Sequence, residues 1–208
     1  EDDCVPSTEF FYFCEEMILK YRDDYRVFSV SGDNSAAINV HNGFSYTFIR
    51  NPLVWGWATW KRSWDLYDQN LSLYVAIKNN VGMMKSIIPN DPERQFRRDS
   101  YDCMLKSIPQ DSWAIAFTWT ALAYRQLTIL PKYNLVSNIG FDADSTHTKE
   151  INQRSFANTA PIFPLIHPPF PYLDAEADSQ VIRKVHNITP LSLCKKIISS
   201  WLGKLKNG

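Results

Sequence analysis

Apolar side chains recur every three or four positions between residues 8 and 22, which predicts an amphipathic helix. The Pro-Ser pair at residues 6–7 supplies a helix start, and the Asp-Asp pair at residues 23–24 predicts a turn after the helix. A short apolar stretch at residues 27–30 then predicts a strand that leads into the Ser-Gly-Asp-Asn sequence of residues 31–34. A helix followed by a strand in this way is typical of α/β domains.

The middle of the chain predicts mostly helices. A short strand is expected at residues 46–49, and a helix is expected after the aromatic segment 55–60. Residues 70–106 predict helices that are broken at Pro89 and Pro92, because proline lacks the backbone donor of a helix interior.

The second half of the chain returns to a mixture of helix and strand. Residues 113–125 predict a helix, residues 127–130 a strand, and residues 135–140 a strand that enters a loop. Five prolines between residues 160 and 171 predict an extended arm, since they exclude a regular helix. The whole pattern therefore predicts an α/β domain.

A basic amphipathic helix is expected at the end of the chain. Between residues 190 and 205 the apolar side chains fall on one helical face and lysines lie elsewhere. Such a helix can lie on an anionic membrane or dock onto the domain's own surface, and the pattern leaves both open. No run is long and apolar enough to cross a bilayer. We therefore expect a cytoplasmic protein, with peripheral contact at the inner face of the membrane as the alternative setting for the tail.

The charge and cysteine content narrow the classes of partner. Lysine plus arginine equal aspartate plus glutamate at 22 each, so a strongly basic surface for nucleic acid is not expected. Four cysteines without a Cys-x-x-Cys pair or a histidine at zinc-finger spacing indicate neither a structural zinc site nor a redox pair. Aromatic residues make up 14% of the chain and gather at residues 55–64 and 113–124. These rings either stack on sugars or bases, or form core.

An acidic triplet, Glu1-Asp2-Asp3, opens the chain. If it follows a strand, its carboxylates lie at the carboxyl edge of a sheet, where open α/β sheets bind ligands. Oxygen ligands of this kind suit Mg²⁺ or Mn²⁺, although an acidic triplet is also typical of a solvated turn. In extended backbone Asp2 and Asp3 point to opposite faces. We expect Asp3 to bind the metal and the other acids to meet the ribose or sugar.

Two further side chains are candidates for chemistry. Asp111 precedes Trp113 at the start of a predicted helix, where its carboxylate can act as a general base or simply cap the helix. His147 lies in a polar loop and can contact a phosphate or the metal, or remain a surface residue. The sequence contains no Gly-x-Ser-x-Gly elbow, P-loop or Gly-x-Gly-x-x-Gly motif, so hydrolase, NTPase and dinucleotide-binding functions have no motif to support them.

Three segments together resemble the nucleotide-diphospho-sugar transferase family of bacterial polysaccharide loci, some members of which carry a hemolysin-like label. The segments are residues 1–11, residues 55–60, and residues 134–148, which include Asn138. The opening is also similar to eukaryotic N-acetylglucosaminyltransferases with a Glu-Asp-Asp form of the GT-A acidic motif. The resemblance covers residues 1–187 and leaves the tail, residues 188–208, outside it.

The resemblance implies a GT-A-type mixed sheet flanked by helices, with the N-terminal nucleotide-binding part missing. It implies that Asp3 binds Mn²⁺ or Mg²⁺, that Glu1 and Asp2 lie beside the donor, and that Asp111 is the catalytic base of an inverting reaction.

The expected function is transfer of a sugar from a nucleotide-diphosphate sugar to the hydroxyl of a glycan or other acceptor. We expect Trp57, Trp113, Asn138 and His147 to contact the substrates. A non-catalytic sugar-binding or nucleotide-sugar-binding module of the same fold and a metal-dependent phosphoester hydrolase are the alternatives.

Overall fold

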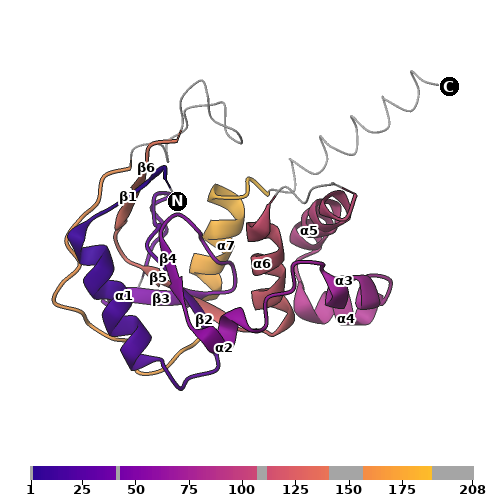
Figure 1. Cartoon of the computed structure of the whole chain (residues 1–208), viewed down its shortest axis with the longest axis horizontal. Coiled ribbons are helices and arrows are strands. Elements are labelled where there is room, and N and C mark those ends of the chain that lie inside the picture. The colour runs from indigo at the N-terminus through magenta and orange to yellow at the C-terminus, as the bar shows by residue number, and fades with distance from the viewer. Residues whose placement is uncertain (1, 41–42, 107–111, 141–156, 189–208) are drawn as a thin grey trace.

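The computed structural model describes residues 2–40, 43–106, 112–140 and 157–188. In these residues the chain forms a mixed α/β structure with seven helices, a four-stranded mixed sheet and a two-stranded sheet (Figure 1). The α/β class expected from the sequence is therefore confirmed at this level.

The four-stranded sheet has the order β3-β5-β2-β4. Its strands are β2 (Val27–Ser31), β3 (Tyr46–Ile49), β4 (Trp57–Thr59) and β5 (Leu127–Pro131). The two central strands, β2 and β5, are parallel, whereas β3 and β4 run antiparallel to their neighbours. Every residue of β2 and β3 is buried, as expected where helices cover both faces of a sheet.

In β3 and β5, neighbouring residues face different helices. Phe48 and Ile129 pack with helix α1 (Thr8–Lys20) in one cluster. Ile49 and Leu130 pack with helix α7 (Ala175–Lys184), and Phe28 packs with helix α6 (Trp113–Ala123). This alternation follows the two-residue period of a strand. The sheet therefore lies between α1 on one face and α6 and α7 on the other (Figure 1).

A second core lies beside α6, away from the sheet. It joins α6 to α3 (Ser72–Ile77), α4 (Val81–Ile87) and α5 (Asp91–Met104) through Tyr74, Tyr101 and Trp119, whose ring centroids are 4.9–5.5 Å apart. Helix α2 (Lys61–Trp64) is a single turn that follows β4. These helices fix α6 against the sheet.

The two-stranded sheet consists of β1 (Cys4–Pro6) and β6 (Val136–Asn138), which pair antiparallel with Cys4 opposite Asn138. It lies beyond the end of β2, where the Leu135 amide donates to the Gly32 carbonyl at 2.9 Å. A Cβ on Gly32 would lie within 2.7 Å of Phe10 and Val136, so glycine is what allows this close approach.

Several sequence expectations need correction. Helix α1 ends at Lys20 rather than at residue 22. Pro89 does separate two helices, but Pro92 does not break one, because it lies in the first turn of α5, where its missing donor is not required. Strands β1 and β4 and helix α7 were not predicted. The extended arm is confirmed, with no regular helix from residue 157 to residue 174.

The tail expected as a basic amphipathic helix lies outside the described residues, as do Glu1, Asp111 and His147. Among the helices that the structure describes, none combines the length and apolar character needed to cross a membrane.

Candidate functional site

The carboxyl ends of the parallel strands β2 and β5 are where several sequence-predicted residues meet. β4 starts at Trp57, directly opposite Ser31, the last residue of β2. Gly56 has φ +67°, and a Cβ there would lie 2.4 Å from Val136. The missing Cβ therefore lets Val136 of β6 lie close to the backbone at the start of β4. Trp57 and the β1–β6 sheet therefore share the edge at which open α/β sheets bind ligands.

Asp3 and Asn138 are brought into contact although 135 positions separate them, since the Asn138 side-chain amide donates to Asp3 Oδ2 at 3.1 Å. Asn138 is almost fully buried, and its Oδ1 accepts from the Gly140 amide at 2.8 Å. A Cβ on Gly140 would lie 2.6 Å from Asp3 Oδ2. Asn138 thus holds the Asp3 carboxylate, Gly140 orients Asn138 and leaves room for the carboxylate, and Asp3 Oδ1 has no hydrogen-bond partner among the described residues.

Asp2 and Asp3 lie in a turn rather than in extended backbone, so alternation along a strand does not decide how their side chains face. Asp2 is exposed and Asp3 is half-buried beside Asn138. Within the described ranges no group of three or more histidine, cysteine, aspartate or glutamate side chains is arranged to hold a metal ion. A single carboxylate such as that of Asp3 is sufficient for Mg²⁺, which takes one or two carboxylates and completes its shell with water and substrate phosphates.

Trp57 and Trp113 also meet, with ring centroids 5.2 Å apart. Phe117 packs 4.8 Å from Trp57, and the rings of Trp64 and Tyr67 stack at 4.8 Å with only 8° between their planes. Trp57 and Trp113 are half-buried and pack against the core, while Trp64 is 44% exposed. The cluster is therefore part of the core that also presents ring surface to solvent.

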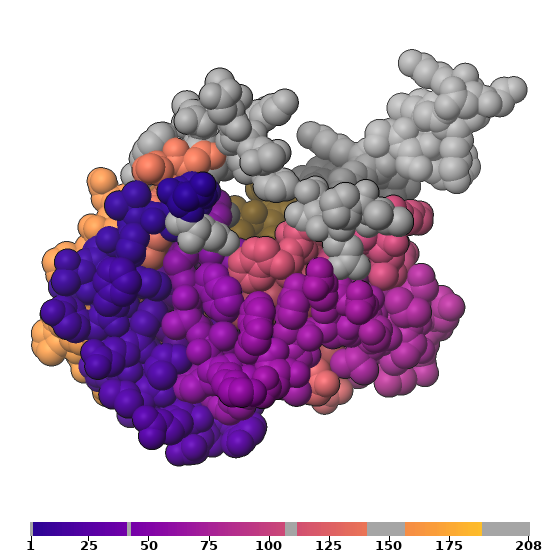
Figure 2. All heavy atoms as spheres, viewed as in Figure 1, coloured from indigo at the N-terminus to yellow at the C-terminus, as the bar shows by residue number. Residues whose placement is uncertain are grey.

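A cavity of about 300 Å³ lies beside this cluster, between α5, α6 and the loops that follow β2 and β3. Asp33 and Trp55 line it together with Arg97, Tyr101 and His186. Figure 2 shows the surface hollowed at this end of the molecule, between the N-terminal residues and α6. Arg97, Tyr101 and His186 were not among the predicted site residues, nor were Asp33 and Trp55, although these two lie in segments that the sequence singles out. Asp33 had a usable signal, because it lies three residues beyond the strand predicted at residues 27–30.

Asp33 belongs to a loop held by local hydrogen bonds. Its Oδ1 accepts from the amide and hydroxyl of Ser35 at 2.8 and 2.6 Å. The side-chain amide of Asn34 donates to the carbonyls of Ile38, Pro131 and Lys132 at 2.9–3.1 Å. These bonds tie the loop after β2 to the end of β5 and fix the floor of the cavity.

The cavity wall carries polar groups from α5. Arg97 is buried and donates through Nη2 to Asn51 Oδ1, and the same nitrogen lies 3.1 Å from His186 Nε2. Tyr101 is fully buried, and burial raises the pKa of its hydroxyl above the ordinary value. That hydroxyl has no hydrogen-bond partner among the described residues, so it is available to a bound ligand.

No protein-family model, curated protein or solved structure matches this chain.

Proposed function

We propose that this chain supplies the metal- and acceptor-binding part of a GT-A-type glycosyltransferase, which moves a sugar from a nucleotide-diphosphate sugar to an acceptor hydroxyl. The observation that carries the proposal is the contact of Asp3 with Asn138 beyond the carboxyl end of β2, the same end at which Trp57 pairs with Ser31. These residues come from distant segments, yet they share one edge beside a cavity.

The donor side of the site centres on Asp3. Asn138 donates to one carboxylate oxygen, and the other has no hydrogen-bond partner in the described part of the chain. Asp3 would hold Mn²⁺ or Mg²⁺ through this carboxylate, and the bound ion offsets the negative charge of a diphosphate leaving group. Glu1 and Asp2 would lie beside the ribose or sugar of the donor.

The acceptor side is the cavity next to α6. Its volume of about 300 Å³ suits a small hydroxylated ligand, to which the Tyr101 hydroxyl, which has no partner among the described residues, offers a polar contact. Asp33, which is bonded to Ser35, also lines the cavity. Sugar rings pack their apolar faces on aromatic side chains, for which Trp57 and Trp113 provide partly exposed surface.

The reaction needs a base for the acceptor hydroxyl. Asp111 precedes α6, which begins at Trp113, by two residues in the sequence and is our candidate. Its carboxylate accepts the hydroxyl proton while the acceptor oxygen bonds to the anomeric carbon. The bond from that carbon to the diphosphate oxygen breaks on the opposite face, and the nucleoside diphosphate leaves. His147 would contact the phosphates of the donor.

Product analysis tests the proposal. The protein that carries this chain is incubated with Mn²⁺ and a panel of UDP-, GDP- and dTDP-sugars, with and without glycan acceptors. Release of nucleoside diphosphate that depends on an acceptor is the expected result. Release of inorganic phosphate would instead indicate a phosphoester hydrolase, and donor binding without any release would indicate a binding module. Either result contradicts transfer.

A variant pair tests the base. Asp111→Asn should retain donor binding and lose turnover by roughly a hundredfold or more, in the range of general-base contributions. Asp99→Asn is the matched control, because Asp99 is exposed on α5 and lines no part of the cavity. Unchanged turnover in Asp111→Asn would remove Asp111 from the mechanism.

A further inference from the structure

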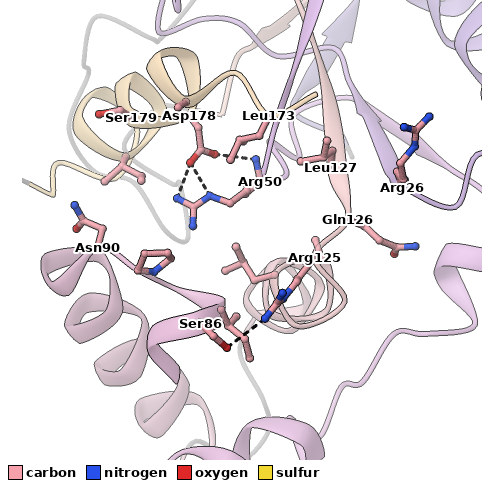
Figure 3. A pocket seen from close by; sticks show the side chains of 16 residues that line it. Arg26, Arg50, Ser86, Asn90, Arg125, Gln126, Leu127, Leu173, Asp178 and Ser179 are labelled. Atoms are coloured by element: carbon pink, nitrogen blue, oxygen red, sulfur yellow. Dashed lines mark hydrogen bonds and ion pairs between the residues drawn. The ribbon is translucent and has the colours of Figure 1, made fainter. Parts of the chain in front are cut away.

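A larger cavity, of about 560 Å³, lies at the opposite edge of the sheet, where β2 and β5 begin. Its walls come from α4 and the loop after it, the end of α6, the strand starts and the first turns of α7 (Figure 3). None of the residues assigned to sugar transfer lines it. Its volume is in the range of small-molecule sites.

The walls combine an apolar interior with arginine side chains. The apolar part consists mainly of Ile87, Leu122, Leu127, Leu173 and Ile182. Three arginines line the cavity, against one acidic residue, Asp178. A ligand that matches both features has an apolar body and an anionic end.

Arg50 presents an unused donor to this cavity. Its Nε and Nη2 donate to Asp178 Oδ2 at 2.8 and 2.6 Å, and Nη2 also reaches Glu93 at 3.1 Å. The remaining nitrogen, Nη1, is buried and has no hydrogen-bond partner among the described residues. In Figure 3 this undashed nitrogen points away from Asp178, into the space between α7 and α6. An acceptor atom of a ligand would satisfy it, which matters because an unmade buried hydrogen bond is costly.

Arg125 lies across the cavity from Arg50, directly after α6 (Figure 3). Its backbone is left-handed, with φ 55°, and its Nη2 lies 3.3 Å from Ser86 Oγ, a long hydrogen bond. In the described part of the chain no carboxylate is within salt-bridge distance of it. The third arginine, Arg26, is already paired with Asp24 at 2.6 Å. Arg125 is therefore the cation in this cavity whose charge is not offset.

We propose that this cavity binds a small organic anion whose apolar body fills the interior and whose carboxylate or phosphate lies between Arg50 Nη1 and Arg125. The site lies at the amino ends of the parallel strands, whereas the proposed transfer site lies at their carboxyl ends. The two proposals rest on different residues and stand or fall separately.

Titration with three naphthalene probes of similar shape tests the site. 1-Naphthyl phosphate and 1-naphthoate carry the anionic end, and 1-naphthol lacks it. We expect saturable binding of at least one anion, detected by calorimetry, and binding of the neutral probe that is weaker by roughly tenfold or more, because a charge-assisted hydrogen bond is lost. The anion that binds more tightly shows whether the site prefers a phosphate or a carboxylate. Equal binding of all three, or no saturable binding, would overturn the proposal.

Variants locate the binding. Arg125→Gln should weaken binding of the anion by about tenfold without unfolding the protein, since Arg125 is exposed. Arg22→Gln is the matched control, because Arg22 is exposed and lies outside the cavity. Ala175→Trp, which places a large ring at an exposed position of the wall, should abolish binding. The same affinity in all variants would place the probe elsewhere and contradict the assignment.

Hydrogen exchange gives an independent readout. The bound anion should slow amide exchange in residues 86–90 and 121–127, which form the cavity, and leave β1 and β6 unchanged. Protection confined to β1 and β6 would instead assign the anion to the transfer site.

Discussion

Replacing Asp178 by asparagine should destabilise the fold strongly, because this residue joins α7 to the sheet. Its side chain is 4% exposed. Oδ1 accepts from the Arg50 amide at 2.8 Å and from Asn51 Nδ2 at 3.2 Å, and Oδ2 accepts from Arg50 Nε and Nη2. Burial alone would lower the pKa of Arg50, but Asp178 and Glu93 raise it above the ordinary value, so the guanidinium stays charged.

The expected loss of stability follows from the contacts that Arg50 keeps in Asp178→Asn. Asparagine keeps the shape of the side chain, but its amide nitrogen is a donor and faces groups that are themselves donors. The charge of Arg50 is then balanced by Glu93 alone. Breaking a buried ion pair in this way costs about 3–5 kcal/mol. At about 2–4 °C per kcal/mol for a chain of this size, the melting temperature should fall by roughly 6–20 °C.

The assay is urea and thermal unfolding, followed by circular dichroism, of the parent, Asp178→Asn and Glu176→Gln. Glu176 lies on the same helix and pairs with Arg183 at 3.2 Å, but its side chain is 59% exposed, so its loss should cost no more than about 1 kcal/mol. If Asp178→Asn costs no more than Glu176→Gln, the Arg50 pair does not anchor α7 and the reasoning is refuted.

Three further predictions concern packing, titration and the site. Burial raises the pKa of the Cys14 thiol from 9.0 to about 12, so the folded state holds this proton while the unfolded chain releases it. The free energy of unfolding should therefore fall between pH 8 and pH 10.5 by about 2 kcal/mol more in the parent than in Cys14→Ala, measured by urea titration at both values. Gly56→Ala should cost about 2–4 kcal/mol in the same assay, because of its positive φ and a contact of 2.4 Å with Val136, and Gly56→Ala with Val136→Ala should recover part of the loss. Gly140→Ala should displace the Asp3 carboxylate and weaken Mn²⁺-dependent donor binding by roughly tenfold, measured by calorimetry, with the unfolding free energy nearly unchanged. The same pH dependence in Cys14→Ala and the parent would contradict the first prediction. Unchanged stability of Gly56→Ala would contradict the second, and unchanged donor affinity of Gly140→Ala would contradict the third.

The elements that could be predicted from sequence are those whose pattern is local. Helix α1 repeats apolar residues at helical spacing, and β2 and β3 are short segments rich in β-branched and aromatic residues. β4 has only three residues, and what makes it a strand is its pairing with β2, which no local pattern encodes. The aromatic segment around it therefore suggested a site without revealing the strand.

Helix α7 was missed because only a few of its residues are apolar. The signals that mark its ends were nevertheless present: Asp174 accepts from the Ala177 amide at the first turn, and Arg183 and Lys184 occupy the last turn. The prolines just before it directed attention to an extended arm. Its anchor, the Asp178–Arg50 pair, joins positions 128 residues apart and could not be read from either segment alone.

The candidate site was likewise predictable only where the signal is local in the sequence. The residue type and position of Asp3 favoured a metal ligand, and the resemblance grouped it with the segment that contains Asn138. Their contact depends on the register of β1 with β6, which the sequence does not specify. Arg97 and Tyr101 were not considered, because on a helix they read as ordinary amphipathic positions.

Calorimetric titration of nucleotide-diphosphate sugars, with and without Mn²⁺, tests the central claim most directly when the parent is compared with Asp3→Ala. Asp23→Ala is the matched control, since Asp23 is an exposed acid in the turn after α1. The account predicts that donor binding requires the metal, persists in Asp23→Ala and falls at least tenfold in Asp3→Ala, as expected when a metal ligand is lost. Donor binding that is independent of Mn²⁺, or equal in Asp3→Ala and the parent, would contradict it.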